Sequence, residues 1–300
     1  MILKEALTNG INSLKSANIQ APVIEAGVIL CHTLGCSRAY LYSHDDYELM
    51  IGEVEAYARM IDERVKGRPL QYITGSQEFM SLDFIVTPDV LIPRQDTEVL
   101  VEEVIHHVSS SRKDNPVILD IGTGSGSIAI SLAHYINNCR VFAMDISKDA
   151  LGVARINAQR CGVSERVVFI TGNILKCPDS LESCLMPGNS GRSKDGPSFD
   201  VIVSNPPYIP TADIAGLELQ VRDFEPHLAL DGGIDGLEFY RSIVKAALDY
   251  VKPEGLIAFE VGVGQADDVA GLLEKGFQNI RIVKDLSGID RVVTAVRIHF

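Results

Sequence analysis

The sequence lacks any segment suited to crossing a membrane or to directing export. It has no run of about 18 uninterrupted apolar residues, which a membrane-spanning helix would need. The segment Met1–Gly10 carries Lys4 and Glu5 and lacks the basic stretch followed by an apolar one that marks a secretory signal. Tryptophan is absent, and the remaining composition, 46% hydrophobic and 22% charged, is that of a globular chain. We therefore expect a soluble, cytoplasmic protein.

Cysteine is scarce and scattered, which bears on both disulfides and metal binding. No CxxC pair occurs, and no set of cysteines and histidines has the repeated spacing of a zinc site. Disulfide frameworks and zinc sites both need such clustering, so we predict structural thiols and no bound metal. The pair His106-His107 also lacks partners at that spacing and is expected on a solvated helix face. The six cysteines are Cys31, Cys36, Cys139, Cys161, Cys177 and Cys184.

A surplus of positive charge is also missing. Lysine and arginine number 27 against 40 aspartates and glutamates, which gives a formal net charge of -13 at pH 7. Proteins that bind nucleic acid usually present clustered Lys and Arg, so nucleic acid is disfavoured as the direct substrate. No patterned interface stands out either, and a monomer is the default expectation.

A chain of 300 residues is expected to form two unequal domains. Apolar residues recur at helical spacing in the first part, and one helix is expected from about Glu48 to Lys66. Residues Gln77 to Val86 switch to alternation, which indicates a short β-hairpin. The predicted divisions are a helical bundle over 1–73, a hairpin linker over 74–92 and a second domain over 93–300.

From Val117 onward, apolar strands alternate with helical segments, which is typical of a parallel, doubly wound α/β sheet. The last two strands are joined by a connection too short for a helical crossover, so they are expected to be antiparallel. The stretch Asp179–Ser198 is rich in Ser, Gly, Pro and charge and is interpreted as a surface insertion without catalytic content. The expected strands are Val117–Ile121, Arg140–Met144, Arg166–Thr171, Phe199–Val203, Gly255–Val261, Ile280–Lys284 and Arg291–Ile298.

A glycine-rich turn, Gly122-Thr123-Gly124-Ser125-Gly126, joins the first of these strands to a helix. Glycines allow a ligand to approach the backbone closely, and the free N–H groups of a helix N-terminus favour an anion such as a carboxylate. A purely structural turn is the alternative. Ser127 stands where a dinucleotide-binding motif has its third glycine, which weakens a nicotinamide-binding interpretation.

Polar side chains follow the neighbouring strands at the same edge of the sheet. Asp120 is placed to meet an ammonium group, and Asp145, about 20 residues later, can accept hydrogen bonds from a ribose diol. Asn173 can bind an adenine amino group, with a plain turn residue as the alternative, and Ile174 can cover the ring. These are the roles that the residues would have towards a cofactor that joins a nucleoside to an amino acid.

The segment Asn205-Pro206-Pro207-Tyr208 follows another buried strand at this edge. Two prolines fix φ and remove two donors, so nearby carbonyl groups become rigid acceptors. The Asn205 side-chain oxygen and the Pro206 carbonyl could accept both N–H bonds of a planar amide and aim its nitrogen at a sulfonium methyl, while Tyr208 packs on the amide plane. A turn that merely closes the strand is the alternative, and the glycine turn and Asp145 disfavour it.

These motifs resemble the release factor glutamine methyltransferase family, also called HemK or PrmC, over nearly the whole chain. Pro93–Glu98 is similar to the family's PRxxTE segment, and Phe224–Leu237 contains elements similar to its EPxxAL, GG and DGL segments. Two departures are Asn173, where many relatives have Asp, and the longer Asp179–Ser198 insertion. Neither departure falls within Asn205-Pro206-Pro207-Tyr208, which is called the NPPY segment below.

The resemblance implies a class I, Rossmann-like methyltransferase with a seven-stranded, mostly parallel sheet and an antiparallel last strand. It also implies a helical N-terminal domain that recognises class 1 peptide chain release factors, and methyl transfer from S-adenosylmethionine to the glutamine of their Gly-Gly-Gln motif. Glu260 and Gln265 resemble an element of the pocket wall. The implied cofactor residues are Asp120, Gly122, Thr123, Gly124, Ser125, Gly126, Asp145, Asn173, Ile174 and Asn205. The implied catalytic residues are Asn205, Pro206 and Tyr208, joined in substrate binding by Pro207, Arg94 and Glu98, and the last two could instead clamp each other.

Three other functions remain open at this stage. One is a nicotinamide-dependent dehydrogenase, which the missing third glycine disfavours. An adenine-N6 DNA or RNA methyltransferase would share the cofactor fold and the NPPY segment, but it would be expected to add a basic groove and base-stacking aromatic residues. A non-catalytic regulator that only binds the cofactor would be expected to have lost Asn205 or Tyr208. Both residues are present.

Overall fold

The computed structural model describes residues 1–111, 113–176 and 199–298. These residues form two compact units, residues 1–76 with 218–224 and residues 77–217 with 225–300. The predicted Asp179–Ser198 insertion lies outside the described residues.

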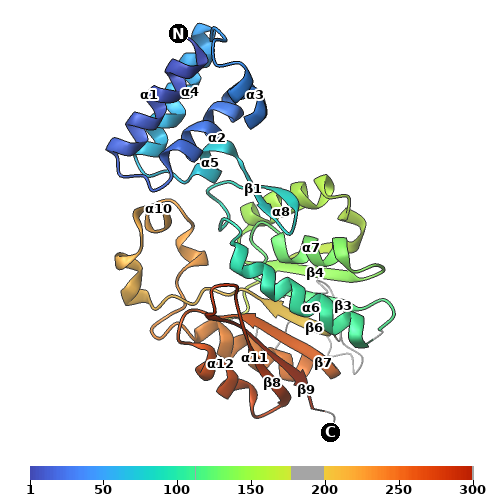
Figure 1. Cartoon of the computed structure of the whole chain (residues 1–300). Helices are drawn as coiled ribbons and strands as arrows, with labels where there is room; N and C mark the ends of the chain where they lie inside the picture. Colours follow the sequence, from blue (N-terminus) through green and yellow to red (C-terminus); the bar gives the residue numbers. More distant parts are fainter. Residues whose placement is uncertain (112, 177–198, 299–300) are drawn as a thin grey trace. The chain divides into compact units, whose positions relative to one another are not determined.

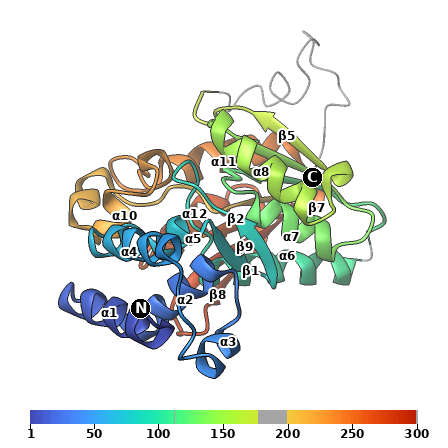
Figure 2. The same ribbon diagram turned by 90° about the horizontal axis from the view of Figure 1, so that it is seen from above.

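The smaller unit is a bundle of helices built around α1, α2 and α4, which pack against one another (Figure 2). Its helices are amphipathic: α1 buries Leu3, Ala6, Gly10 and Leu14, which lie on one face at helical spacing. The bundle was predicted from this periodicity, whereas two short helices, α3 and α5, were not. The helices are α1 (Leu3–Ser16), α2 (Pro22–Leu34), α3 (Arg38–Ser43), α4 (Ile51–Val65), α5 (Leu70–Thr74) and α10 (Leu219–Arg222).

The short helix α10 belongs to this bundle although it is distant in sequence. Arg64 of α4, only 7% exposed, forms an ion pair with Glu25 of α2 at 2.5 Å. The same guanidinium donates to the Gln220 side chain at 3.4 Å. The Cδ2 atom of Leu219 lies 2.1 Å from where a Cβ on Gly67 would stand, so a glycine is needed for this close approach. Residues 218–224 are therefore an integral part of the helical unit.

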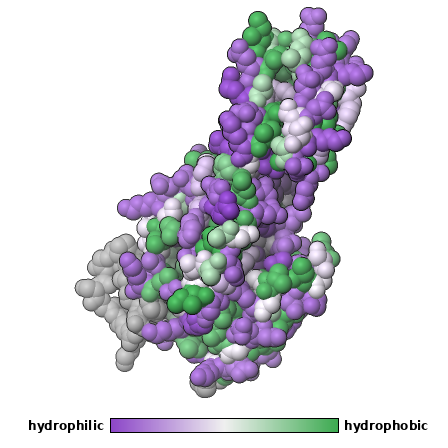
Figure 3. All heavy atoms as spheres, turned by 90° about the vertical axis from the view of Figure 1, so that its left-hand side faces the viewer, coloured by the Kyte–Doolittle hydropathy of each residue, from purple (hydrophilic) through white to green (hydrophobic). Residues whose placement is uncertain are grey.

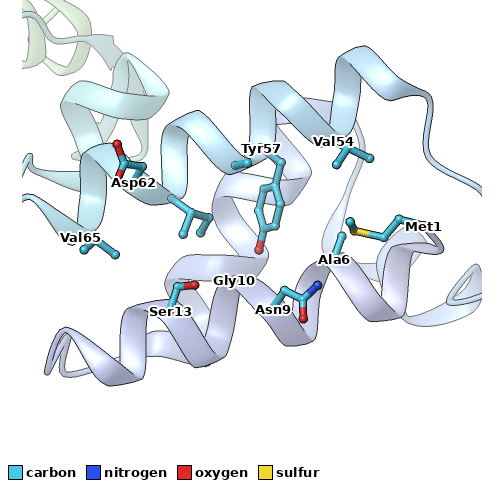
Figure 4. Close-up of a pocket in the computed structure, with 11 residues that line it drawn as sticks. Met1, Ala6, Asn9, Gly10, Ser13, Val54, Tyr57, Asp62 and Val65 are labelled. Atoms are coloured by element: carbon cyan, nitrogen blue, oxygen red, sulfur yellow. The ribbon is translucent and has the colours of Figure 1, made fainter.

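A groove of about 370 Å³ lies between α1 and α4. Tyr57 of α4 points across it, with its hydroxyl group at Gly10 of α1 (Figure 4). This hydroxyl lies 2.0 Å from where a Cβ on Gly10 would stand, and it donates a hydrogen bond to the Ala26 carbonyl at 3.3 Å. Gly10 thus allows the close packing of three helices.

The larger unit begins with a β-hairpin, as the alternation predicted. Its strands β1 (Ser76–Phe79) and β2 (Leu82–Ile85) form a two-stranded sheet. Met80 and Ser81 between them both have positive φ, as in a type I′ turn. Asn157 bonds both backbone groups of Ile85 and the Ser125 carbonyl, at 2.8 to 3.0 Å. The hairpin is thereby fixed to the helix that carries Asn157 and to the glycine turn.

The main sheet has seven strands in the order β5-β4-β3-β6-β7-β9-β8 (Figure 1). The strand β9 is antiparallel to both β7 and β8, and the other neighbouring pairs are parallel, which confirms the predicted architecture. The strands are β3 (Val117–Ile121), β4 (Arg140–Asp145), β5 (Val167–Thr171), β6 (Phe199–Ser204), β7 (Val251–Glu260), β8 (Phe277–Lys284) and β9 (Asp290–Arg297).

Helices cover both faces of the sheet. One apolar cluster joins α6, α7 and α8 to one face, where α6 and α7 lie side by side (Figures 1 and 2). A second cluster joins α11 and α12 to the other face. The strands carry apolar residues on both faces, as expected for buried parallel strands. The helices are α6 (Glu98–Ser111), α7 (Ser127–Tyr135), α8 (Lys148–Arg160), α11 (Glu238–Tyr250) and α12 (Ala266–Leu273), with short 3-10 turns at Gln95–Thr97, Ser164–Arg166, Thr211–Gly216 and His227–Ala229.

The strand order reverses at β3 and β6, because the chain runs outward through β4 and β5 and then returns to the other side of β3. In open α/β sheets, ligands bind beyond the carboxyl ends of the strands at this point.

The surface view shows mostly hydrophilic residues broken by separate hydrophobic patches (Figure 3). No helix within the described ranges is long and apolar enough to span a bilayer.

Two glycine substitutions test the helical packing. Gly10→Ala should destabilise the helical unit by about 1–3 kcal/mol, because its methyl group would collide with the buried Tyr57 ring. Gly27→Ala is the matched control, because Gly27 is also helical and nothing lies within 4 Å of an added Cβ. This control should gain about 0.5–1 kcal/mol from helix propensity. Urea unfolding of both variants gives the comparison, and equal stabilities would contradict the packing argument.

Candidate active site

The glycine turn lies at the reversal point, directly after β3. Gly122, Gly124 and Gly126 all have positive φ, between 54° and 83°, a conformation that other residues rarely adopt. The N–H groups of Gly122 and Thr123 donate to the Met144 carbonyl, which holds the turn against β4. A Cβ on Gly126 would stand 2.7 Å from Ile130 and 3.1 Å from Ala154. The turn therefore needs its glycines for both conformation and packing.

Asp120, the second-to-last residue of β3, is fully buried, and only one of its two carboxyl oxygens has a hydrogen-bond partner among the described residues. Its Oδ2 atom accepts a hydrogen bond from the Thr123 hydroxyl at 2.6 Å, while its Oδ1 atom has no partner among the described residues. Burial raises the pKa of this carboxyl group to about 7. A buried oxygen without a partner is costly, and a ligand ammonium would satisfy it. The site thus fits the amino group expected of the cofactor.

Asp145, the last residue of β4, is also at this edge. Its Oδ2 atom accepts from the Gly124 N–H at 2.8 Å, and its Oδ1 atom accepts from the Ser147 N–H at 2.9 Å. Burial raises the pKa of this carboxyl group as well. A carboxylate oxygen can accept more than one hydrogen bond, so both oxygens retain capacity for the hydroxyl groups of a ribose.

Asn173 and Ile174 follow β5, but their side chains are already engaged. The Asn173 Oδ1 atom accepts from the Leu175 N–H at 2.9 Å, which is the local bond of a turn residue. Ile174 is 4% exposed and packs in the apolar core beneath the sheet. This geometry favours the turn alternative for the Asn173 oxygen. Adenine binding by these two residues stays a prediction.

The NPPY segment lies beside the glycine turn. The Ser204 hydroxyl donates to the Ile121 carbonyl at 2.6 Å, which joins the ends of β6 and β3. The Asn205 backbone oxygen lies 4.0 Å from where a Cβ on Gly122 would stand. The Asn205 Nδ2 atom donates to the Thr97 hydroxyl oxygen at 3.3 Å. Two motifs separated by about 80 residues are thus adjacent, as the parallel sheet predicted.

Tyr208 is packed into the wall of this region. Its ring contacts the apolar core on the α11 and α12 face. Its backbone carbonyl accepts a hydrogen bond from the Gln265 side chain at 2.9 Å. Burial raises the pKa of the phenol to about 12. Tyr208 is therefore neutral at ordinary pH and suited to packing rather than to proton removal.

Gly232 and Gly236 lie so close to the backbone of Tyr208 that there is no room for a side chain at either position. A Cβ on Gly232 would stand 2.7 Å from the Tyr208 Cα, and a Cβ on Gly236 would stand 2.3 Å from the Tyr208 carbonyl oxygen. The Ile209 N–H donates to the Leu230 carbonyl at 3.1 Å, and the Gly232 N–H donates to the Ile209 carbonyl at 2.8 Å. The segment from Leu230 to Gly236 therefore packs against the backbone at the end of NPPY and holds it in place. The sequence indicated it only through the family resemblance.

Arg94 and Glu98 have different partners from those considered above. Arg94 pairs with the buried Glu225 at 2.5 Å, and the Glu98 carboxylate accepts from the Met80 N–H at 2.7 Å. The two side chains therefore anchor the loop before α6 and do not clamp each other. The Arg94 side chain is still 40% exposed, so a substrate-binding role remains a prediction.

Three residues were missed as members of the site or given only a general role: Thr97, Glu260 and Arg291. Thr97 is 3% exposed and touches Asn205, and Glu260 is 2% exposed at the end of β7. Arg291 of β9 forms ion pairs with Asp96 and Asp285, each at 3.2 Å. Of these three residues, only Glu260 could have been found from the sequence, as an acidic residue near the end of a predicted strand. No group of three or more His, Cys, Asp and Glu side chains that could hold a metal occurs in the part of the chain described.

Comparison with known proteins agrees with this geometry. Residues 5–75 match the family model described as the PrmC N-terminal domain, and residues 112–285 match the model of a methyltransferase domain. The release factor glutamine methyltransferase of Moorella thermoacetica is 42% identical over 299 residues, covering 99% of both chains. The protein of the same name from Geobacter sulfurreducens is 42% identical over 281 residues, covering 93% of this chain and 91% of its own.

Among solved structures, a methyltransferase from Pyrococcus furiosus is similar in fold. It aligns with a TM-score of 0.50 at 18% identity and covers 79% of this chain and 100% of its own. At that identity the likeness concerns the fold alone.

The half-paired Asp120 predicts a pH dependence of cofactor binding. A bound ammonium favours the ionised carboxylate, so a protein protonated at Asp120 must first lose its proton. Affinity for S-adenosylhomocysteine, which carries this ammonium, should be highest just above pH 7 and should weaken as pH falls below the Asp120 pKa of about 7. The limiting slope is about tenfold per pH unit.

Calorimetric titration across this pH range measures the effect. Asp120→Asn should bind more weakly at pH 7.5 and lose most of the dependence. Asp145→Asn, which alters the ribose side of the site, should retain it. An unchanged slope in Asp120→Asn would assign the dependence to another group.

Proposed function

Because the chain belongs to the release factor glutamine methyltransferase family, we propose that it methylates the glutamine of the Gly-Gly-Gln motif in class 1 peptide chain release factors. The acceptor is the side-chain amide nitrogen, and the donor is S-adenosylmethionine. The adjacency of Asn205 to the glycine turn is the observation that carries this proposal, because it brings an amide-binding segment to the cofactor edge.

The described residues fit the cofactor at both of its polar ends. The unpaired Asp120 oxygen would accept from the ammonium group, and Asp145 would accept from the ribose hydroxyls. The N-terminal end of α7 after Gly126 favours the carboxylate. When bound, S-adenosylmethionine supplies a methyl group activated by the positive sulfur. The work of the protein is to bind, orient and exclude water.

A glutamine amide is a poor nucleophile because its nitrogen lone pair is delocalised into the carbonyl group. Asn205 Oδ1 and the Pro206 carbonyl accept the two N–H bonds of this amide and fix the direction of the nitrogen. Their partial negative charges stabilise the positive charge that develops on nitrogen during transfer. Pro206 and Pro207 fix the backbone φ, so these acceptors need no rearrangement.

No strong base is required at the moment of transfer. The nitrogen becomes strongly acidic once it carries the methyl group, so its proton can leave to water afterwards. Tyr208, whose pKa is raised to about 12 by burial, remains a neutral phenol and packs against the amide plane. The site therefore acts mainly by positioning.

The helical unit is proposed to recognise the release factor. Residues 5–75 match a domain model that accompanies this activity in the family, and the unit also contains residues 218–224. Residues 218–224 come shortly after Asn205-Pro206-Pro207-Tyr208 in the sequence. A cytoplasmic location follows from a substrate that works in translation. The monomeric state stays a prediction, and sedimentation of the purified protein would check it.

Methylation of adenine is the second candidate, because adenine also presents a planar nitrogen to an NPPY segment. The formal charge of -13 does not favour a nucleic acid groove. A non-catalytic regulator is disfavoured because Asn205 and Tyr208 are both present beside the cofactor edge.

Asn205→Ala should lower the rate of methyl transfer about a hundredfold or more, because its oxygen acts mainly in the transition state. Affinity for S-adenosylhomocysteine should stay within about threefold. Mass spectrometry of the Gly-Gly-Gln peptide, after incubation of a full-length release factor with labelled S-adenosylmethionine, measures the transfer. Asp120→Asn is the counterpart, because it should weaken cofactor binding and recover transfer at high cofactor concentration.

The same reaction with duplex DNA separates the two candidates. A single methyl group on the release factor glutamine, absent with Asn205→Ala, supports the proposal. Methylated adenine in the DNA would instead show that the chain is a nucleic acid methyltransferase. Loss of cofactor binding in Asn205→Ala equal to its loss of transfer would contradict the role given to Asn205.

A further inference from the structure

A buried carboxyl group stands beside NPPY at the end of the neighbouring strand. Ser204 of β6 pairs with Phe259 of β7 in parallel register, so the next residues along, Asn205 and Glu260, are neighbours. Glu260 is 2% exposed, and its Oε2 atom has no hydrogen-bond partner among the described residues. The Tyr240 hydroxyl donates to the Glu260 backbone carbonyl at 2.9 Å, which fixes this end of the strand. A carboxyl group so buried needs a reason beyond stability.

The polar side chains near the Glu260 carboxylate can form hydrogen bonds in only one consistent direction. Burial raises the pKa of the Glu260 carboxyl group, whereas the nearby side chains of Thr97 and Asn205 lower it, so both polar groups favour the carboxylate. A carboxylate can only accept, so the single proton of the Thr97 hydroxyl points to Glu260. The Thr97 oxygen is then free to accept from Asn205 Nδ2, at 3.3 Å. An ionised Glu260 therefore makes the Asn205 amide turn its NH₂ group inward.

We propose that Glu260 is a positioning residue that fixes the Asn205 amide, directly and through Thr97, with its oxygen towards the substrate nitrogen. The proposal rests on the function proposed above. In a reversed Asn205, the NH₂ group would face the N–H bonds of the substrate amide, and two donors would oppose each other. The two orientations have nearly the same shape, so packing alone cannot select between them. A buried acceptor can.

The charges that face Glu260 come from several elements. Arg291 of β9 is attractive, and Asp96 in the loop before α6 is repulsive; these two also pair with each other at 3.2 Å. Tyr208 and Tyr240 are neutral neighbours whose own pKa values are raised by burial and by Glu260. Burial dominates and raises the pKa of Glu260 to about 7.

Protonation would remove the directional constraint. A neutral Glu260 can donate its own proton to Thr97, and the chain of hydrogen bonds can then reverse. The kcat at saturating cofactor should therefore fall as pH is lowered through the Glu260 pKa of about 7. Saturation with cofactor separates this effect from the Asp120 effect, which acts on cofactor binding.

Glu260→Gln tests the proposal, because the amide has the shape of the carboxyl group but can both donate and accept. Its kcat for the release factor should fall about 10- to 100-fold, its kcat should become nearly independent of pH around neutrality, and its affinity for S-adenosylhomocysteine should stay within about twofold. Its melting temperature should not fall, since a buried charge is removed.

Asp200→Asn is the matched control, because Asp200 is a buried carboxylate at the opposite end of β6, where it pairs with Lys252 at 2.8 Å. This control should lose stability and keep its kcat and pH profile. A Glu260→Gln enzyme with the wild-type kcat and pH profile would overturn the proposal. If the wild-type chain itself fails to methylate the release factor, the proposed function fails instead.

Thr97 gives an independent second test should Glu260→Gln fold poorly. Thr97→Ser retains the hydroxyl group and should lose much less kcat than Thr97→Val, which has the shape of threonine without it. In the Thr97→Val background, Glu260→Gln should cost clearly less than it does alone, because the two residues act in part through one chain of hydrogen bonds. Equal kcat values for the serine and valine variants, or additive losses in the double variant, would contradict the role given to this chain.

Discussion

The parallel pairing of β3 with β6 is the constraint on which the candidate site depends. Asp120 pairs with Val203 in this register, so the glycine turn and NPPY emerge side by side, although about 80 residues separate them in the sequence. The Ser204 hydroxyl on the Ile121 carbonyl fixes this adjacency at 2.6 Å. The strand order reverses at the same place, so no connecting helix crosses the edge and a ligand can occupy it.

Several carboxyl groups of the larger unit are buried although burial of an acid lowers stability, and two of them, Asp120 and Glu260, lie at this edge of the sheet. Asp120, Glu225 and Glu260 each have one oxygen without a partner among the described residues, and burial raises the pKa of all three. An acid whose pKa is raised on folding destabilises the folded state as pH rises from the unfolded pKa to the folded one. For Asp120 and Glu260 this cost is explained by a ligand ammonium or a reactive amide that needs a fixed acceptor, whereas Glu225 is the ion-pair partner of Arg94. Asp200, at the other end of the sheet, instead pairs with two lysines, and its pKa is lowered by Lys252, Val117 and Lys113 against the effect of burial.

The periodicity of the sequence predicted the seven strands, the antiparallel β9 and the helical bundle, because each depends on local pattern and short connections. The inclusion of residues 218–224 in the bundle could not be predicted, since it depends on contacts such as Gln220 with Arg64 across 156 positions. The order of the motifs along the chain predicted that the glycine turn, Asp120, Asp145 and NPPY lie at one edge of the sheet. The partners of Arg94 and Glu98, the turn bond of Asn173 and the contact of Thr97 with Asn205 depend on side-chain geometry, which spacing alone does not contain.

A crystal structure of the chain with S-adenosylhomocysteine and a release factor would test the central claim most directly, namely that NPPY holds a substrate amide at the cofactor edge. The account predicts that the ammonium contacts Asp120 and that Asn205 Oδ1 and the Pro206 carbonyl both lie within hydrogen-bonding distance of the glutamine side-chain nitrogen. A glutamine bound away from NPPY, or an Asn205 amide that turns its nitrogen towards the substrate, would contradict it.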